Sequence, residues 1–117
     1  MRHKNGIKKL SKPTDQRIAL LRSLVLSLFT YNKIKTTHKR AMEARRMAEK
    51  LITLSKENSL FSRRQALRIL PNEEIISQLF SQSSSRFQGK NSGYTRVIKL
   101  HFRKGDFTPV SLLEFVE

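Results

Sequence analysis

Few residues in this chain are of the types that perform catalysis. Its 117 residues include three histidines and nine Asp and Glu residues, and no cysteine. His3, His38 and His101 lie far apart, so no two of them have the spacing of metal ligands on one helical turn. The sequence also lacks an HExxH zinc motif, a phosphate-binding glycine loop and a nucleophile elbow. We therefore expect no catalytic residues, no metal, no cofactor and no small-molecule substrate.

Basic side chains dominate the charged residues. The chain has 24 Lys and Arg against 9 Asp and Glu, which gives a net charge of +15 and a pI near 11.0. Residues 1–50 hold fourteen of the 24 basic residues and only three of the nine acids. Such a chain attracts polyanions, so the predicted partner is nucleic acid or an anionic membrane. The absence of cysteine is typical of a reducing compartment.

The apolar run from Ile18 to Phe29 is the one segment that could be mistaken for a signal peptide. Arg22 interrupts the run, no small-residue cleavage site follows it, and it is shorter than the roughly 20 apolar residues of a membrane span. Its apolar residues recur at helical spacing, which predicts a core helix. We expect no membrane partner, although a basic amphipathic membrane-active peptide is an alternative that the run leaves open.

Residues 1–13 are predicted to form an extended basic N-terminal arm. The segment has no acid and little apolar surface, so it cannot bury itself and should become ordered on a partner. Its Lys and Arg residues are Arg2, Lys4, Lys8, Lys9 and Lys12. The alternative is a frayed, solvated terminus. Residues 14–117 are predicted to form a single domain, because a chain of this length has room for one core.

Hydrophobic periodicity predicts four helices in that domain. The expected ranges are residues 15–29, 38–54, 59–70 and 72–80. Thr14, Thr37, Ser59 and Asn72 have side chains suited to capping the four helix starts. The last helix is expected to end in the serine-rich stretch 81–85. We assign four aromatic residues on the apolar faces to the core: Phe29, Phe61, Phe80 and Phe102.

Three short segments have the patterns of β-strands. Residues 34–37 are rich in β-branched side chains. Residues 94–103 alternate, with Tyr94, Arg96, Ile98, Leu100 and Phe102 on one face, which predicts a half-buried strand. A turn at 104–106 leads to a further strand at 110–116, which predicts an antiparallel hairpin. The predicted fold class is α+β, with about four helices on a small mixed or antiparallel sheet. This sheet combines a short central strand with the C-terminal hairpin.

The basic residues are spread over the arm, the helices and a loop at residues 86–93. Phosphate binding requires such a spread, whereas no helix carries a clear set of base-reading side chains. Besides the arm, the charge pattern predicts RNA contacts at Lys33, Lys35, Lys39, Arg40, Arg45, Arg46, Arg63, Arg64, Arg86 and Lys90. The alternative is a solvated helix face, on which Glu43 and Glu49 pair with Arg45 and Arg46.

Tyr94 and Arg96 lie where the basic loop leads into a strand. A tyrosine there can stack on a splayed base, and a neighbouring arginine can bind a phosphate. The alternative is that Tyr94 packs in the core, as aromatic residues at strand starts often do.

Several short motifs occur in an order that resembles a known family. They are MRHKNGIKKL at the start, IKTT at 34–37, LITLSK at 51–56, SRRQAL at 62–67, RF at 86–87, GYTRVIK at 93–99, and then Gly105, Asp106, Pro109 and Glu114. By these motifs, which span nearly the whole chain, the sequence resembles the bacterial-type large-subunit ribosomal protein seventeen family.

The resemblance implies an α+β protein whose basic surface and N-terminal segment bind large-subunit ribosomal RNA. It implies a structural role in translation, a position near the exit of the nascent-chain tunnel, and contacts with neighbouring large-subunit ribosomal proteins. Carried over by position, it implies RNA contacts at Arg2, His3, Lys4, Lys8, Lys9, Arg17, Lys35, Arg45, Arg46, Arg63, Arg64, Tyr94 and Arg96.

Two questions stay open on the sequence alone. A DNA-binding, nucleoid-type protein is the alternative function, because the same charge and the arginine-rich segment near residue 63 would also bind DNA. The resemblance implies a location in the large ribosomal subunit and leaves open whether this is in a bacterial cytoplasm or in a plastid or mitochondrial matrix.

Overall fold

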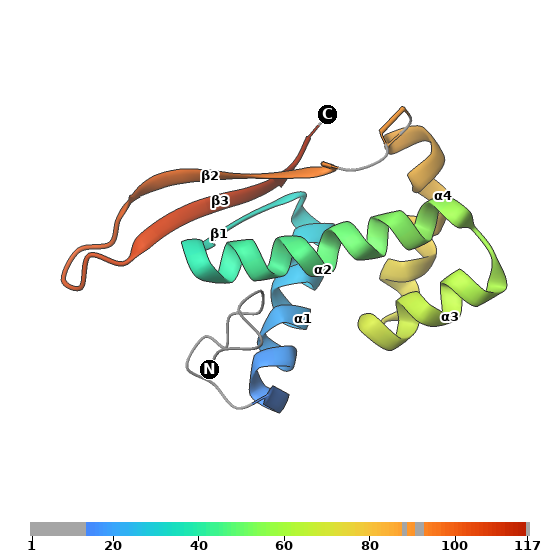
Figure 1. Ribbon diagram of the computed structural model, residues 1–117, viewed down its shortest axis with the longest axis horizontal. Helices are drawn as coiled ribbons and strands as arrows, with labels where there is room; N and C mark the ends of the chain where they lie inside the picture. Colours follow the sequence, from blue (N-terminus) through green and yellow to red (C-terminus); the bar gives the residue numbers. More distant parts are fainter. Residues whose placement is uncertain (1–13, 88, 91–92, 117) are drawn as a thin grey trace, which may run out of the picture.

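The computed structural model describes residues 14–87, 89–90 and 93–116, so the predicted arm lies outside the described residues. Helices and strands follow one another as α1 (Thr14–Tyr31), β1 (Lys33–Thr37), α2 (His38–Glu57), α3 (Leu60–Ile69), α4 (Glu73–Arg86), β2 (Thr95–Phe102) and β3 (Pro109–Phe115). The four helices and three strands confirm the predicted α+β class (Figure 1).

The sheet is entirely antiparallel, with the strand order β1-β3-β2. The β2–β3 hairpin is confirmed. The expectation that residues 34–37 form the central strand is wrong, because β1 is an edge strand and β3 lies between its two neighbours. The burial pattern gives the physical reason. Four residues of β3 are buried: Val110, Ser111, Leu113 and Phe115. This is expected for a strand that has a neighbouring strand on each side and a helix packed on the sheet.

Helix α2 is the element that joins the sheet to the other helices. It contacts all three strands and also α1, α3 and α4. Figure 1 shows α2 running along the sheet, with α3 and α4 grouped near its C-terminal end. Leu28, Leu51, Ile52 and Leu113 are fully buried where α1, α2 and the sheet meet. Burial of this apolar surface is the main force that holds the elements together.

Two of the predicted helix caps are confirmed in detail. The Ser59 hydroxyl accepts a hydrogen bond from the Ser62 amide at 3.0 Å, and the Asn72 side-chain oxygen accepts one from the Ile75 amide at 3.0 Å. Both bonds satisfy an amide that has no partner within its helix. Thr37 does occupy the N-cap position of α2, but its side chain makes no capping hydrogen bond.

Helix α4 extends further than the sequence suggests. It continues through the serines at 81–85 to Arg86, so the expectation that the helix ends within this serine-rich stretch is wrong. The Ser81 and Ser85 hydroxyls donate to carbonyls one turn earlier in α4, at 2.9 and 3.1 Å. The Ser83 hydroxyl donates to the Ser55 carbonyl of α2 at 3.1 Å. Serine is tolerated here because these hydroxyls bond to carbonyls instead of breaking the helix.

Two aromatic residues assigned to the core are exposed. Phe29 packs against the core and Phe80 is buried, as predicted, whereas Phe61 is 69% exposed and Phe102 is 65% exposed. The exposure of Phe102 agrees with the burial pattern along β2. Thr95 is buried and Val97 is half-buried, while Ile98, which points the opposite way, is exposed. The far part of the hairpin projects beyond the start of α2, so none of the described helices lies over it (Figure 1).

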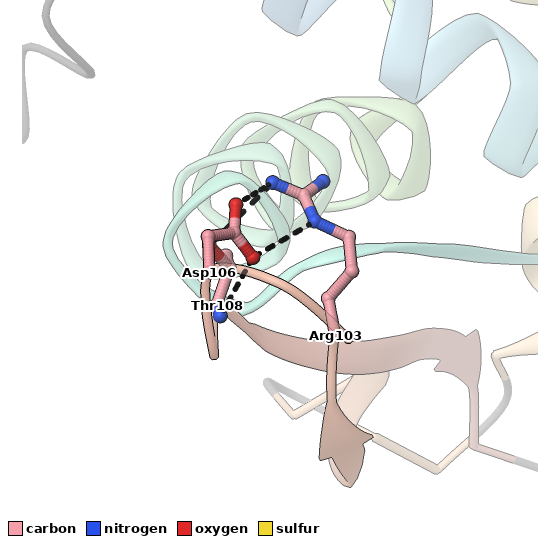
Figure 2. Close-up of polar contacts among 3 residues, drawn as sticks. All are labelled: Arg103, Asp106 and Thr108. Carbon is pink, nitrogen blue, oxygen red and sulfur yellow. Dashed lines mark hydrogen bonds and ion pairs between the residues drawn. The ribbon is translucent and has the colours of Figure 1, made fainter.

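The tip of the hairpin is held by a local ion pair. Figure 2 shows the Arg103 guanidinium directed at the Asp106 carboxylate, with Nη2 lying 2.6 Å from Oδ2. The Thr108 amide donates to the Asp106 carboxylate at 3.2 Å. The hydrogen bond from Arg103, followed by those from Thr108, lowers the pKa of Asp106 well below its ordinary value. The predicted turn is therefore confirmed, with Asp106 as its main acceptor.

No helix within the described ranges is long and apolar enough to span a bilayer.

Candidate nucleic-acid interface

The outer face of the sheet carries a row of three charged side chains. Strand register places Lys33 of β1 and Arg96 of β2 on either side of Glu114 of β3. The next residue on β3, Leu113, is fully buried on the helix-covered face. Because side chains alternate along a strand, the row containing Glu114 faces away from the helices. Lys33 and Arg96 are both exposed.

A third cation extends this surface. Lys35 occupies the next outward position of β1, where it is exposed beside Leu112 of β3, in the same row as Ile98 of β2. The Arg96 side chain forms an ion pair with Glu114, with Nη2 and Oε2 2.5 Å apart. The face thus carries the charges of Lys33, Lys35 and Arg96 against one carboxylate. This excess of positive charge is suited to binding phosphates.

Helix α2 presents a second basic surface. Lys39, Arg46 and Lys50 are exposed at spacings of seven and four residues, which aligns them along one side of the helix. The opposite side, which includes Ala44, Ala48 and Leu51, is buried. Arg46 lies 3.8 Å from Glu43, so the expected intrahelical pairing exists but is long. This side of α2 is separate from the outer face of the sheet, because α2 packs on the inner face.

Helix α3 adds a third, smaller basic surface. Arg64 and Arg68 are exposed one helical turn apart. Arg63 is half-buried, and its guanidinium lies 5.1 Å from the centre of the Phe80 ring, in cation–π contact. The side chain of Arg63 therefore contributes to packing between α3 and α4, and Arg64 is the better placed of the two predicted arginines to meet a ligand.

Three predicted cations are already engaged within the protein or partly buried. Arg86 donates to the Asn32 side chain at 2.6 Å, and its guanidinium lies 4.3 Å from the centre of the Phe115 ring. Arg45 is half-buried, and its Nε atom is buried with no hydrogen-bond partner among the described residues. Arg40 is half-buried on α2. These residues have less freedom to meet RNA than the exposed lysines.

Two other predicted cations are half-buried. Arg17 lies in the first turns of α1, and Lys90 lies in the loop after α4. The Lys90 carbonyl accepts a hydrogen bond from the Lys56 ammonium. The remaining predicted contacts lie outside the described residues: Arg2, His3, Lys4, Lys8, Lys9 and Lys12.

Tyr94 belongs to the core, so the prediction that it stacks on a base is wrong. Its side chain is 1% exposed and meets the Phe87 ring edge-on, with ring centres 5.4 Å apart. The Lys56 ammonium lies over the Tyr94 ring, 5.2 Å from the ring centre. A ring enclosed by two such neighbours has no free face for a nucleobase.

Sequence reasoning missed four residues that the structure makes relevant. Lys50 and Arg68 extend the basic surfaces, and a signal was present, because each follows a predicted arginine by four residues. Tyr31, which lies beyond the predicted helix range 15–29, is 70% exposed. Arg22 acts within the fold, since it donates to the Ile69 and Arg68 carbonyls at 2.9 and 3.1 Å.

The described part of the chain contains no cluster of three potential metal ligands among His, Cys, Asp and Glu. The imidazole Nδ1 of His38 lies 2.8 Å from the Ser111 hydroxyl and so links the start of α2 to β3.

A family model described as "Ribosomal protein L17" matches residues 20–116. The chain belongs to this family. The predicted resemblance is therefore confirmed, and so is the expectation that the chain is not an enzyme, because the family is a structural constituent of the ribosome. Relatives named "Large ribosomal subunit protein bL17" are similar over nearly the entire chain.

The relative from Hydrogenobaculum sp. is 46% identical over 118 residues, which cover all of both proteins. That from Dictyoglomus thermophilum is 44% identical over 116 residues, which cover 99% of this chain and all of the relative. That from Treponema denticola is 47% identical over 117 residues, all of this chain. The chain spans 65% of the length of the Treponema protein.

Proposed function

We propose that this chain is a structural protein of the large subunit of a bacterial ribosome, and that it binds large-subunit ribosomal RNA. The observation that carries the proposal is the full-length similarity to proteins named as large-subunit constituents. The exposed basic surfaces supply the physical means of binding, because each lysine or arginine that neutralises a phosphate releases condensed counterions.

The RNA-binding surface is proposed to combine the outer face of the sheet with the basic sides of α2 and α3. Lys33, Lys35 and Arg96 contact phosphates from the sheet. Lys39, Arg46 and Arg64, extended by Lys50 and Arg68, contact phosphates from the helices. These groups lie on different sides of the molecule, which suits a protein that wedges between separate RNA helices more than one that binds a single duplex.

The N-terminal segment is proposed to act as an RNA-binding arm. Removal of residues 1–12 deletes five Lys and Arg residues. Thermal unfolding of the shortened protein should stay cooperative, while its affinity for ribosomal RNA and the salt dependence of that affinity should fall. A loss of cooperative unfolding would instead assign the segment to the core.

The position near the exit of the nascent-chain tunnel and the contacts with neighbouring ribosomal proteins are the finer part of the proposal. Cross-linking of intact ribosomes with a lysine-reactive reagent tests both, because Lys33, Lys39 and Lys50 are exposed. Cross-links to proteins that surround the tunnel exit are expected. Cross-links confined to proteins of another region would exclude this position.

The decisive experiment is sedimentation of a cell lysate through a sucrose gradient after a high-salt wash, with the protein followed by mass spectrometry. Near-stoichiometric co-sedimentation with the large subunit is expected. Recovery at the top of the gradient, or with chromosomal DNA, would reject the ribosomal role. In a gel-shift competition, structured ribosomal RNA should displace duplex DNA, and the opposite order would favour the nucleoid alternative.

A further inference from the structure

A hollow of about 490 Å³ opens beside the turn between α1 and β1. The residues that line it come from α1, the following turn and all three strands: Tyr31, Asn32, Lys33, Arg96, Glu114 and Phe115. Its volume falls within the roughly 300–1,000 Å³ of typical ligand pockets. The Tyr31 side chain is 70% exposed at the rim of this hollow. An aromatic ring left so open beside basic side chains has an unused stacking surface.

The turn that carries Tyr31 is held in place from two sides. Asn32 has a left-handed backbone with φ of 71°, a conformation that asparagine tolerates better than most residues. Its amide donates to the Leu28 carbonyl at 2.7 Å, and its side-chain oxygen accepts from Arg86 at 2.6 Å. Arg86 is itself stacked 4.3 Å from the centre of the Phe115 ring. Arg86 therefore positions the turn, and Tyr31 projects from a fixed backbone.

Two cations on the same side of the sheet lie within reach of a ligand in the hollow. Lys33 and Arg96 flank Glu114 in the outward-facing row. Arg96 directs Nε and Nη2 at one oxygen of Glu114, at 2.6 and 2.5 Å. A guanidinium has five N–H donors, so donors of Arg96 are left for a phosphate. Glu114 orients Arg96, and the row keeps a net positive charge.

We propose that this hollow receives one unstacked nucleotide from a single-stranded or bulged segment of RNA. The base stacks on the Tyr31 ring, while Lys33 and Arg96 bind the adjacent phosphate. The inference rests on the proposed RNA-binding function and assigns a distinct recognition mode to this face. Duplex RNA is excluded from the hollow because its bases are stacked and paired, whereas single strands offer base faces to aromatic side chains.

The two tyrosines of the chain make a direct spectroscopic test possible. The sequence has no tryptophan, and Tyr94 is buried, so Tyr94→Phe leaves Tyr31 as the sole tyrosine reporter. This variant is first checked for cooperative unfolding. A short oligouridylate should then quench the Tyr31 emission as it binds, while a blunt RNA duplex of the same length should bind with little quenching. Equal quenching by both RNAs, or binding of the oligouridylate without quenching, would overturn the proposal.

Affinity measurements on otherwise unmodified protein keep the test independent of the Tyr94 variant. Tyr31→Leu should weaken oligouridylate binding about tenfold, the size of one lost base–aromatic stack, and leave duplex binding unchanged. Tyr31→Phe should retain the affinity, because the stacking surface remains. Phe107→Leu is the matched control, since Phe107 is 76% exposed at the distant hairpin tip. An equal loss in Phe107→Leu and Tyr31→Leu would reject a specific role for Tyr31.

The outcomes separate this inference from the proposed function. Binding of duplex and single-stranded RNA with no effect of Tyr31→Leu rejects the nucleotide site and leaves the general RNA-binding role intact. Failure to bind either RNA, at low salt as well as at moderate salt, rejects both. Quenching by an acidic peptide at the concentrations that suffice for oligouridylate would assign the hollow to a protein segment instead.

Discussion

The Glu49 carboxylate accepts hydrogen bonds from both the amide and the hydroxyl of Thr95, at 2.7 and 2.6 Å. The Tyr94 amide donates to the same carboxylate at 3.2 Å. Glu49 lies in the middle of α2, and Thr95 is the first residue of β2. This acceptor therefore fixes the point at which β2 enters the sheet, and hence the placement of Arg96 on the outer face.

Replacement of Glu49 by Gln should destabilise the protein by about 1.5–3 kcal/mol, the usual range for a hydrogen bond to a charged group. The amide keeps one oxygen acceptor but loses the charge and the second acceptor. The midpoint of urea unfolding should fall with an unchanged denaturant dependence. Glu74→Gln is the matched control, because Glu74 is exposed in the first turn of α4. A loss as large in Glu74→Gln would contradict the role given to Glu49.

Glu49 also illustrates what the sequence does not reveal. By helical spacing it was a possible partner of the nearby arginines, and Glu43 does lie near Arg46. Glu49 instead accepts a hydrogen bond from the first residue of β2, which lies 46 residues later in the chain. Intrahelical partners can be predicted from spacing, whereas a partner from a distant strand depends on how the elements pack.

Leu28→Ala should cost about 2–5 kcal/mol of unfolding free energy, because Leu28 is fully buried between α1 and the rest of the core. Leu60→Ala is the matched substitution at a surface position, since Leu60 is 65% exposed at the start of α3. Its effect should stay within about 0.5 kcal/mol. Chemical denaturation of both variants measures the difference, and similar losses would mean that the core does not lie where the structure places it.

The helices could be predicted because their signals are local. The cap at Ser59 and the apolar positions of α2 follow from side chains a few residues apart. The buried face of β2 could not be predicted, because Ile98, Leu100 and Phe102 form the more apolar side of the strand. Ile98 is exposed because it lies on the outer face of the sheet, in the row of Leu112, and the far part of the hairpin projects past the start of α2 (Figure 1). Both follow from element lengths and packing. The role of Tyr31 could not be predicted for the same reason, because Arg96 and Glu114, which line the same hollow, come from the other end of the chain.

The ion pair at the hairpin tip should make the stability of this region depend on pH. The pKa of Asp106 is lower in the folded protein than in the unfolded chain, because Arg103 donates to the ionised carboxylate. Its stabilising contribution is therefore present above about pH 4 and lost as the pH falls through the folded pKa. In an NMR titration, the Asp106 carboxyl should titrate at lower pH than in the Arg103→Met variant.

The Asp106→Asn variant serves as the control for this pH dependence. The difference in unfolding free energy between this variant and the unmodified protein should be largest near neutral pH. It should shrink below about pH 4, where the carboxyl becomes protonated in the unfolded chain while it is still ionised in the folded protein. A difference that does not change with pH would show that the carboxylate charge is unimportant at the tip.

Substitution of Arg22 should affect stability but not RNA binding, and substitution of Arg46 should do the reverse. Arg22 donates to two carbonyls at the end of α3, so Arg22→Met should lower the unfolding free energy by about 1–3 kcal/mol. Arg46 is exposed and its ion pair is long, so Arg46→Gln should change stability by less than about 0.5 kcal/mol.

The effect of the same two substitutions on RNA binding is measured by filter binding to transcribed large-subunit ribosomal RNA at several salt concentrations. Arg46→Gln should reduce the salt dependence by about one phosphate contact, and Arg22→Met should leave it unchanged. The reverse pattern would mean that the basic side of α2 is not part of the RNA-binding surface.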